Sequence, residues 1–590
     1  MKKIILLLLV LLEVNCANAS HMMGGEITWE CSGSNYIFTL KVYRDCREIV
    51  LGTGIQQLLV DNHPSITTIN CAFVSIADLS APGCGYDCSI ANAPGGAVEE
   101  YIFKSAPINL GNVTPPANGW IFTWNLCCRN SAIMNLNNPG LLDMTLRSKM
   151  FSYNGRPADP CFDNSPAFAE RPASFICSGN AYSYSNVAFD AEADSLIYSW
   201  DKTAEGSGAS LQLLNYKAPY TTTSQLPGFP VMDQYTGKVN LTPDTAMLQQ
   251  GDFATCIRVD AYKCNVKVAE IYREARVELT NACPPLFGGG GGNHSPQILD
   301  VTTNLPFLDY NDTVFAGDTI ALSIKFQDLD FNSNPISLQV TTATAKGLEF
   351  GINDTGTTGC LYPPCATLNH PSPYTFSPAS VFLFNWITGC NHVVSSNVCI
   401  NNQSVYQFEF KADDNYCPSQ GSNTSTVTIV VKGPLITAAG ATLSCSFPNG
   451  TLQWYLDSVL IPGATGSSLQ ATTNGIYTVI ATLPGGCSIS SPAYPHGVSE
   501  TATVFPEIIY TDIVPNPSNG IFDLRINASL NGHGFIRIAN LSGRMIDQHT
   551  VYFEKGSNHF PVDLSRHSSG VYELQFYSSG GVSHQKIIID

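Results

Sequence analysis

The sequence of 590 residues is poor in charged side chains, with Asp, Glu, Lys and Arg together making up only 13% of it. Basic residues are the scarcer kind, 29 against 47 acidic ones, and the formal net charge is −18. Nucleic-acid phosphates are bound by clustered Lys and Arg side chains, so this balance argues against nucleic acid as a partner. Helices of soluble proteins rely on Glu, Lys and Ala, and no sustained helical spacing of apolar residues follows residue 19.

Short catalytic motifs are also missing. The chain contains no G-x-S-x-G, H-E-x-x-H or G-x-x-x-x-G-K-[ST] motif, and its eleven histidines are scattered. We therefore predict a protein that is not an enzyme. An unrecognised polysaccharide hydrolase is kept as an alternative, because the two carboxylates of such an enzyme can lie far apart in sequence.

Long apolar runs are absent after the N-terminal end. No stretch beyond residue 19 approaches the roughly eighteen apolar residues of a transmembrane helix, so we expect no membrane span in the mature chain. The first residues have the organisation of a secretory signal peptide. Lys2 and Lys3 precede the apolar run 4–12, and residues 17–19 (Ala-Asn-Ala) form a cleavage site, which predicts a signal peptide at 1–19.

Cysteine is abundant, with twenty residues, of which Cys16 belongs to the predicted signal peptide. The cysteines are spread along the chain and are not arranged in repeated C-x2-C pairs, which favours disulfides over zinc in an exported protein. The remaining number is odd, so at least one thiol is free or bonded to another molecule. For the adjacent Cys127 and Cys128 we expect disulfides to two different distant cysteines.

Gly, Pro, Asn, Ser and Thr are also abundant, and they separate short runs in which apolar and polar residues alternate. This period of two is that of β-strands, and it predicts an all-β chain of tandem β-sandwich domains. The expected units are an N-terminal Cys-rich β-domain (20–165), a β-sandwich (170–283), a Pro/Gly linker (284–295), a second β-sandwich (296–432), a compact domain (435–500) and a small C-terminal β-sandwich (507–590).

Four short motifs are spaced along the first unit: GGEI at 24–27, YRDC at 43–46, CCRN at 127–130 and NSP at 164–166. This series resembles the N-terminal region of large Bacteroidetes surface proteins of the gliding-motility-associated or adhesin-like kind. The resemblance implies a location on the cell surface and assigns no chemistry to the four motifs.

Acidic residues alternate in a loop of the second unit. Asp190, Glu192 and Asp194 precede a short strand, and alternating carboxylates can face one point, where Ca²⁺ takes six to eight oxygen ligands. We therefore predict a weak Ca²⁺ site at these residues, with a solvated turn as the alternative. The unit resembles cadherin-like and related immunoglobulin-like repeats, in which an acidic D-x-D-x-D loop precedes a strand, although Ala193 replaces the usual Gly.

The compact domain contains Cys445, a central Trp454, a G-x-Y turn ending at Tyr477, and Cys487. This order is that of immunoglobulin domains, and the unit resembles bacterial immunoglobulin-like surface repeats. Cys487 lies ten residues after Tyr477 and not two, so the bridge differs from the standard one between the two sheets. We predict a disulfide between Cys445 and Cys487.

The C-terminal segment carries the most specific pattern. Its marks are a V-P-N-P-S-N-G turn, an L-S-G-R turn, a G-V-Y step and a closing K-I-I-I-D run, which contain Pro515, Asn516, Pro517, Gly520, Gly543, Gly570, Tyr572 and Lys586. The segment resembles the C-terminal sorting domain of proteins exported through the type IX (Por) secretion system of Bacteroidetes. The resemblance implies transport across the outer membrane after the signal peptide has directed the chain across the inner one.

Together these features predict an exported, non-enzymatic protein of the cell surface that acts in adhesion or gliding motility. The expected partners are the type IX machinery and, outside the cell, surface polysaccharide, glycans or other cell-surface proteins. Calcium is the one cofactor considered. The alternative to a surface component is a secreted carbohydrate-binding or scaffold protein.

Overall fold

The structure, a computed structural model, describes residues 22–46, 50–79, 88–89, 97–172, 175–177, 182–228, 230–241, 251–264, 266–280, 293–333, 336–350, 359–393, 402–417, 420–497, 508–528, 532–540, 545–578 and 581–589. Within these ranges the regular elements are β-strands and three-residue 3-10 turns, η1 (Pro139–Leu141), η2 (Gly208–Ser210) and η4 (Cys390–His392). The all-β fold class is therefore confirmed. None of the helical segments in this part of the chain is long and apolar enough to cross a membrane. The predicted signal peptide lies outside the described residues.

The N-terminal body is built on one large sheet in the order β1-β2-β5-β4-β3-β6-β7-β18-β17-β12, with β9 paired to β18. Its strands are β1 (Met22–Ser32), β2 (Asn35–Asp45), β3 (Gln56–Asp61), β4 (Thr68–Asp78), β5 (Val98–Ser105), β6 (Trp120–Leu126), β7 (Met144–Met150), β9 (Phe175–Cys177), β12 (Ser195–Trp200), β17 (Gly251–Lys263) and β18 (Val266–Thr280). One edge of β18 pairs with β17, and the other pairs with both β7 and β1. The strands from β1 to β7 therefore curl until their two ends meet at β18. Trp29, Phe38 and Phe122 pack together in the core of this curled sheet.

This sheet crosses the boundary predicted between residues 165 and 170. Strands β9, β12, β17 and β18 come from the second expected unit, and the other strands come from the first. The division into 20–165 and 170–283 therefore does not separate two sheets. The second range adds small sheets and pairs made of β8 (Ala167–Phe168), β10 (Tyr182–Tyr184), β11 (Ala188–Phe189), β13 (Ala204–Glu205), β14 (Gln212–Leu213), β15 (Val231–Met232) and β16 (Val239–Leu241).

Residues 297–432 form a β-sandwich of a four-stranded and a five-stranded sheet, β19-β21-β27-β25 and β20-β29-β28-β24-β26, with a β22-β23 hairpin. The strands are β19 (Gln297–Asp300), β20 (Tyr310–Phe315), β21 (Thr319–Gln327), β22 (Phe331–Ser333), β23 (Ile336–Leu338), β24 (Thr341–Lys346), β25 (Thr367–Leu368), β26 (Tyr374–Phe376), β27 (Ala379–Ile387), β28 (Gln403–Asp413) and β29 (Ser422–Lys432). In β27 the alternate residues Phe382, Phe384 and Trp386 are buried, as a strand with one face on a core requires.

The next domain has two small sheets, β30-β31-β34 and β33-β32-β35-β36, with β37 paired to β35. Its strands are β30 (Ile436–Ala439), β31 (Thr442–Cys445), β32 (Thr451–Leu456), β33 (Val459–Leu460), β34 (Ser468–Gln470), β35 (Gly475–Thr482), β36 (Ser488–Ser490) and β37 (Tyr494–His496). Trp454 is fully buried, and the Tyr477 hydroxyl donates to the Thr473 carbonyl at 2.8 Å. A buried Trp and a Tyr bonded back to the chain just before it are features of immunoglobulin-like sandwiches.

The C-terminal domain packs β38-β39-β42 against β41-β40-β43-β44. The strands are β38 (Ile508–Val514), β39 (Ile521–Ala528), β40 (Gly532–Asn540), β41 (Met545–Phe553), β42 (Gly556–Asp563), β43 (Gly570–Ser578) and β44 (Gly581–Ile589). Its hydrophobic core consists of residues from this segment alone.

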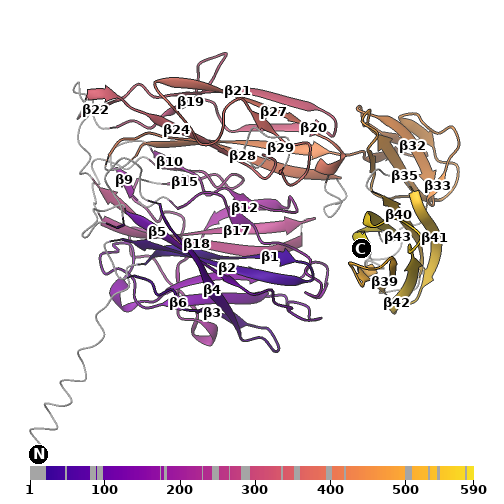
Figure 1. Ribbon diagram of the computed structural model, residues 1–590, viewed down its shortest axis with the longest axis horizontal. Helices are drawn as coiled ribbons and strands as arrows, with labels where there is room; N and C mark the ends of the chain where they lie inside the picture. Colours follow the sequence, from indigo (N-terminus) through magenta and orange to yellow (C-terminus); the bar gives the residue numbers. More distant parts are fainter. Residues whose placement is uncertain are drawn as a thin grey trace, which may run out of the picture.

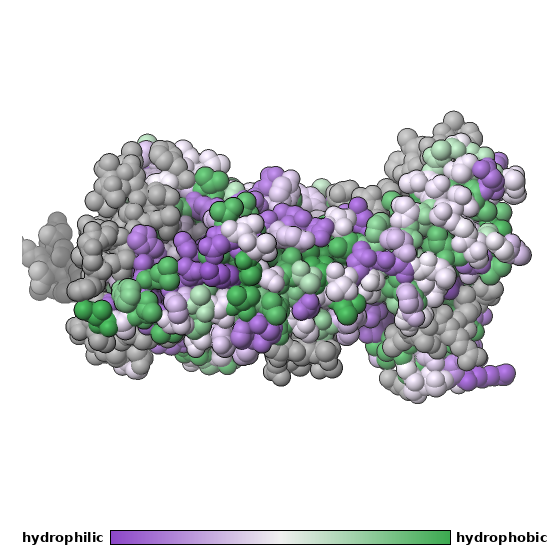
Figure 2. Space-filling view, turned by 90° about the horizontal axis from the view of Figure 1, so that it is seen from above, coloured by the Kyte–Doolittle hydropathy of each residue, from purple (hydrophilic) through white to green (hydrophobic). Residues whose placement is uncertain are grey.

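The 297–432 sandwich lies along the N-terminal body, and the two C-terminal domains lie to one side of both (Figure 1). Polar contacts join the sandwich to the body: Lys346 Nζ donates to the Ala169 carbonyl at 2.9 Å, and the Tyr362 hydroxyl donates to the Ala191 carbonyl at 2.9 Å. The outer face of the sandwich carries hydrophilic and hydrophobic side chains interspersed (Figure 2).

Two cysteine predictions are wrong. Cys487 is bonded to Cys390 and not to Cys445, which is a buried free thiol. The position two residues after Tyr477, where immunoglobulin domains have their second cysteine, holds Val479, so Cys445 has no cysteine at the usual place across the core. Because Cys390 lies in η4, the disulfide joins the 297–432 sandwich to the domain that follows it.

The adjacent Cys127 and Cys128 are bonded to each other, which contradicts the expectation of two distant partners. This bond links two neighbours in sequence, so neither residue ties its segment to a distant part of the chain. Disulfides also join Cys31 to Cys161, Cys46 to Cys88, and Cys360 to Cys365.

Candidate functional site

Three of the four N-terminal motifs meet on β18, and the fourth contacts β1. Three buried ion pairs join GGEI, YRDC and CCRN to this strand: Glu26 with Arg273, Asp45 with Arg276, and Arg129 with Glu274. The NSP motif contributes Ser165, whose Oγ accepts the Trp29 N–H at 2.8 Å. Charges in a protein interior require partners, and here the partners come from the sequence on both sides of residue 165. The motif residues therefore connect β18 to the curled sheet and do not form an open site.

The acidic loop predicted to bind calcium is folded on its own carboxylates. Asp190 Oδ1 accepts the backbone N–H groups of Glu192 and Asp194, each at 3.0 Å. Glu192 accepts the backbone and side-chain N–H groups of Asn164. Asp190 and Asp194 are buried and Glu192 is half-buried, so the loop is not a solvated turn.

The cation beside this loop is Lys263 at the end of β17. Its Nζ lies 2.5 Å from Asp163 Oδ1 and 3.7 Å from Asp194 Oδ2, and its side chain is buried. Burial lowers the pKa of Lys263, but attraction to Asp163, Asp194 and Glu192 outweighs it, so the pKa is raised overall. Burial raises the pKa of Glu192 to about 7, and burial together with the charge of Asp194 raises the pKa of Asp190 well above its usual value.

This arrangement does not resemble a calcium shell. Among the described residues, oxygen atoms of Asp190, Glu192 and Asp194 do not all come within 4.8 Å of one another, as ligands of one ion would. Lys263 supplies positive charge at this place instead. Calcium binding by these three residues stays a prediction that this geometry does not favour.

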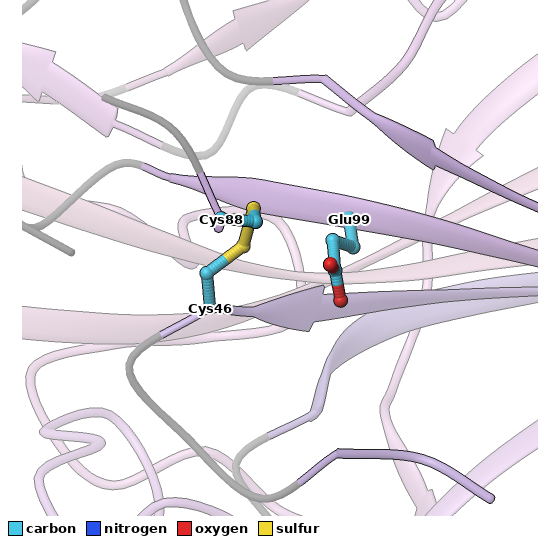
Figure 3. A group of neighbouring side chains, drawn as sticks. All are labelled: Cys46, Cys88 and Glu99. Carbon is cyan, nitrogen blue, oxygen red and sulfur yellow. A yellow bond between two sulfur atoms is a disulfide. The ribbon is translucent and has the colours of Figure 1, made fainter. Parts of the chain in front are cut away.

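A single group of potential metal ligands does meet that distance in the described part of the chain: Cys46, Cys88 and Glu99 (Figure 3). Cys46 and Cys88 are joined as a disulfide, and Glu99 pairs with Arg44 Nη1 at 2.5 Å. A metal binds thiolates, which a disulfide lacks. The group therefore fixes the end of β2 and is not a metal centre in this oxidised state.

In the C-terminal domain, the marks at the two ends of the segment come together. Asn516 donates through Nδ2 to the Lys586 carbonyl and accepts the Ile588 N–H at 2.8 Å. The Ser518 N–H donates to the Ile588 carbonyl at 2.9 Å, so the turn is bonded to β44. Pro515, Asn516 and Pro517 are exposed, as is Lys586, and together they form an accessible surface beside the last strand.

Two of the other marks, Gly520 and Tyr572, are buried in the same domain. Gly520 has a φ of +95°, and a Cβ there would lie 2.7 Å from Ser565 Cα, so only glycine fits. The Tyr572 hydroxyl donates to the Ser568 carbonyl at 2.6 Å and the ring is buried, while Gly570 is exposed. Gly543 lies outside the described residues.

The sequence reasoning located the acidic loop but missed Lys263 and Asp163. Neither residue is marked by the spacing of the acidic loop, because Lys263 ends a strand about 70 positions away and Asp163 belongs to no acidic run. A charged residue inside an otherwise buried strand was the available hint.

A comparison with protein families matches residues 512–590 to the secretion system C-terminal sorting domain. The match covers the turn, the strands and the closing run described above, and it supports the interpretation of the chain as cargo of the type IX secretion system. No curated protein matches the chain.

Similar solved structures include dimeric latent PorU from Porphyromonas gingivalis, 10% identical, covering 77% of this chain and 36% of that chain at a TM-score of 0.13. Human protocadherin-24 EC1-2 is 18% identical, covering 46% of this chain and 100% of that chain at 0.14. Drosophila N-cadherin EC1-4 is 12% identical, covering 75% and 92% at 0.14. The chain thus spans about a third of the PorU chain, and likenesses at such TM-scores carry no argument about function.

Proposed function

We propose that the protein is exported by the type IX secretion system and works on the cell surface without enzymatic activity, in adhesion or as a component of the gliding apparatus. The observation that carries the proposal is the sorting domain at 512–590. Its core is separate from those of the preceding domains, and its turn at 515–517 is exposed beside β44. An exported chain can present such a surface to the secretion machinery while its other domains are folded.

The export step is tested by deleting residues 508–590. We expect the shortened chain to accumulate in the periplasm with its N-terminal domains folded, because the deleted core contains no residue from them. Asn516→Ala should reduce surface display, since it removes both bonds to β44. The matched control is Asn519→Ala, whose side chain accepts the Ile521 N–H within the same turn. Undiminished surface display of the deletion variant would refute the proposal.

The adhesive role rests on the architecture. The chain consists of sandwich domains in tandem, and the Cys390–Cys487 disulfide links two of them covalently. This arrangement suits a protein that extends a binding face from a surface. Cells lacking the protein should attach less firmly to surfaces or glide more slowly, and the full chain should restore both. Glycan-array binding by released protein, with normal attachment and gliding in the deletion strain, would favour a secreted carbohydrate-binding protein.

A further inference from the structure

The β22-β23 hairpin of the 297–432 sandwich carries an apolar face that is exposed. Phe331 is paired with Leu338, and residues paired directly across an antiparallel ladder share a face. Ile336 lies two positions before Leu338 on the same strand, so its side chain points the same way. The alternation places the flanking Leu329 and Val340 on this side as well. We call these five residues the apolar hairpin face.

Each of the five side chains is large and apolar, yet each is open to solvent. Their exposed fractions run from 37% for Leu338 to 60% for Leu329. With about 150–200 Å² for a large apolar side chain, the five exposed parts amount to roughly 400 Å². Apolar patches of this size on a folded domain mark interaction sites.

The opposite face of the hairpin is polar and holds it on the sandwich. Gln339 is fully buried, and its Nε2 donates to Asn293 Oδ1 at 2.7 Å. Asn332 Nδ2 and the Val340 N–H both donate to Asn415 Oδ1, at 3.3 and 2.9 Å. An antiparallel hairpin ordinarily packs its apolar face on the core and leaves its polar face in water. Here the order is reversed, so packing within the described part of the chain does not account for the apolar side chains.

The hairpin lies at the end of the molecule opposite the two C-terminal domains (Figure 1). Figure 2 shows hydrophobic side chains at the same end. A chain held at the cell through its sorting domain would therefore present the hairpin outward, toward whatever the cell meets. In this respect the inference rests on the proposed function.

The size and composition of the apolar hairpin face argue against a protein as its partner. Two copies joined through it would bury roughly 800 Å² in total, below the about 1,200 Å² at which specific interfaces begin. Residues 328–340 include no Trp, Tyr or Arg, the types that supply most of the binding energy at protein interfaces.

A lipid bilayer accepts the side chains that are present. Leu, Ile, Phe and Val are the residues whose insertion into a bilayer is favourable. Residues 328–340 also lack Lys, and the net charge of −18 opposes attraction to anionic headgroups. The backbone of the hairpin is paired in its own ladder, so side chains can enter the acyl region without exposing unpaired strand groups there.

We propose that the apolar hairpin face inserts into the surface of an electrically neutral lipid bilayer. Phe331, Ile336 and Leu338 enter the acyl region, while the polar face stays on the sandwich. The contact needs no particular headgroup, because it depends on the burial of apolar surface. One copy binds weakly by this means, and many copies displayed on one cell bind together.

The test is flotation of the full mature chain with phosphatidylcholine vesicles in a density gradient. We expect the parent chain to float with these vesicles, and to float no better when they contain an anionic lipid. Phe331→Thr and Ile336→Thr keep a residue that suits a strand but remove most of the apolar area. Each should lower the partition coefficient by about tenfold or more.

Val459→Thr is the matched control, because Val459 is 68% exposed in the β32-β33 hairpin of the immunoglobulin-like domain. This variant should float like the parent chain. Ile336→Trp locates the contact, since the added fluorescence should be quenched by lipids brominated on their acyl chains, and that of Val459→Trp should not. The substituted side chains are exposed, so all variants should melt like the parent chain.

The proposal fails if the parent chain does not float, if the two threonine variants float like it, or if flotation requires anionic lipid. Self-association that Ile336→Thr abolishes, without vesicle binding, would identify a second copy as the partner instead. Attachment to target cells that depends on Phe331 and is lost after protease treatment of those cells, without vesicle binding, would identify a protein. The vesicle assay uses purified chain, so its outcome and that of the export assay are independent.

Discussion

Replacing Arg273 by Met would leave Glu26 buried without its hydrogen-bonded ion-pair partner. Both side chains are only 1% exposed, and Arg273 Nε donates to Glu26 Oε2 at 2.7 Å. Removing one partner of a buried ion pair costs about 3–5 kcal/mol, since the remaining charge has lost water as well as its partner. Lys41 Nζ, 3.6 Å from Glu26 Oε1, retains part of the attraction. Arg273 also lies over the Phe168 ring at 3.9 Å, a contact that Met preserves in part. We therefore expect Arg273→Met to lower the opening free energy of the sheet by about 3 kcal/mol.

The double variant separates a lost pair from a general disturbance of packing. With Glu26→Leu added to Arg273→Met, no buried charge is left unpaired, because Lys41, the other partner of Glu26, is 26% exposed; apolar replacement of a buried pair is often nearly neutral. We expect the double variant to be more stable than either single one. Lys104→Met is the control: Lys104 and Glu30 form a pair in the same sheet at 3.0 Å, but they are 42% and 52% exposed, so less than about 1 kcal/mol should be lost.

Native-state hydrogen exchange is the appropriate assay, because a chain of several domains does not unfold in one step. Peptides covering 22–32 and 266–280 report the opening of β1 and β18 directly. A loss below about 1 kcal/mol in Arg273→Met, or a double variant as unstable as the sum of the single ones, would show that the pair does not join the two halves of the sheet.

Three further predictions concern the cysteines, the buried acids and the sorting domain. Peptide mapping without reduction should recover Cys390 linked to Cys487, while Cys445 reacts with thiol reagents only after unfolding; a Cys445–Cys487 peptide would contradict this. Burial raises the pKa of Glu192 and Glu409 to about 7 and that of Asp414 to about 8, so the folded chain keeps protons that the unfolded chain releases above about pH 4.5. Their contribution to stability is full below that pH and is lost as pH rises to about 8. The melting temperature should therefore be higher at pH 5 than at pH 8 at constant ionic strength. A melting temperature that is higher at pH 8 than at pH 5 would contradict this prediction. Gly520→Ala should destabilise the sorting domain by about 1 kcal/mol or more, since alanine strains at a φ of +95° and meets Ser565, and an unchanged unfolding midpoint would count against this account of the turn.

Local sequence patterns predicted β-strands, but they could not identify which strands far apart in the sequence pair with one another. The predicted period of two is seen in β27, where the alternate residues Phe382, Phe384 and Trp386 are buried because each strand residue points to the face opposite its neighbours. The pairing of β18 with β1 joins Glu26 to Arg273 across 247 positions, and nothing in a strand's own period identifies its neighbour.

The predictions for the acidic loop and for the sorting domain have the same limit: they identified local patterns but not the residues that the fold brings against them. The carboxylates of the acidic loop were found by their spacing, but Lys263, which lies against them, becomes a neighbour only through the fold. In the sorting domain the turn at 515–520 and the closing run were recognised separately as marks, and the bonds of Asn516 to β44 show why both are present. The Cys445–Cys487 prediction failed because Val479 occupies the position that would have completed the familiar pattern.

The Cys390–Cys487 disulfide determines how the protein would transmit tension. If the C-terminal end is held at the cell surface while the N-terminal body is attached elsewhere, the load enters the immunoglobulin-like domain after Cys487 and passes through the disulfide to Cys390. The force then bypasses the 97 positions between the two cysteines, so this segment, which would be about 330 Å long when fully extended, cannot unravel. Pulled in an oxidising medium, this part of the protein acts as an inextensible link, and it becomes a long compliant tether only when the disulfide is reduced.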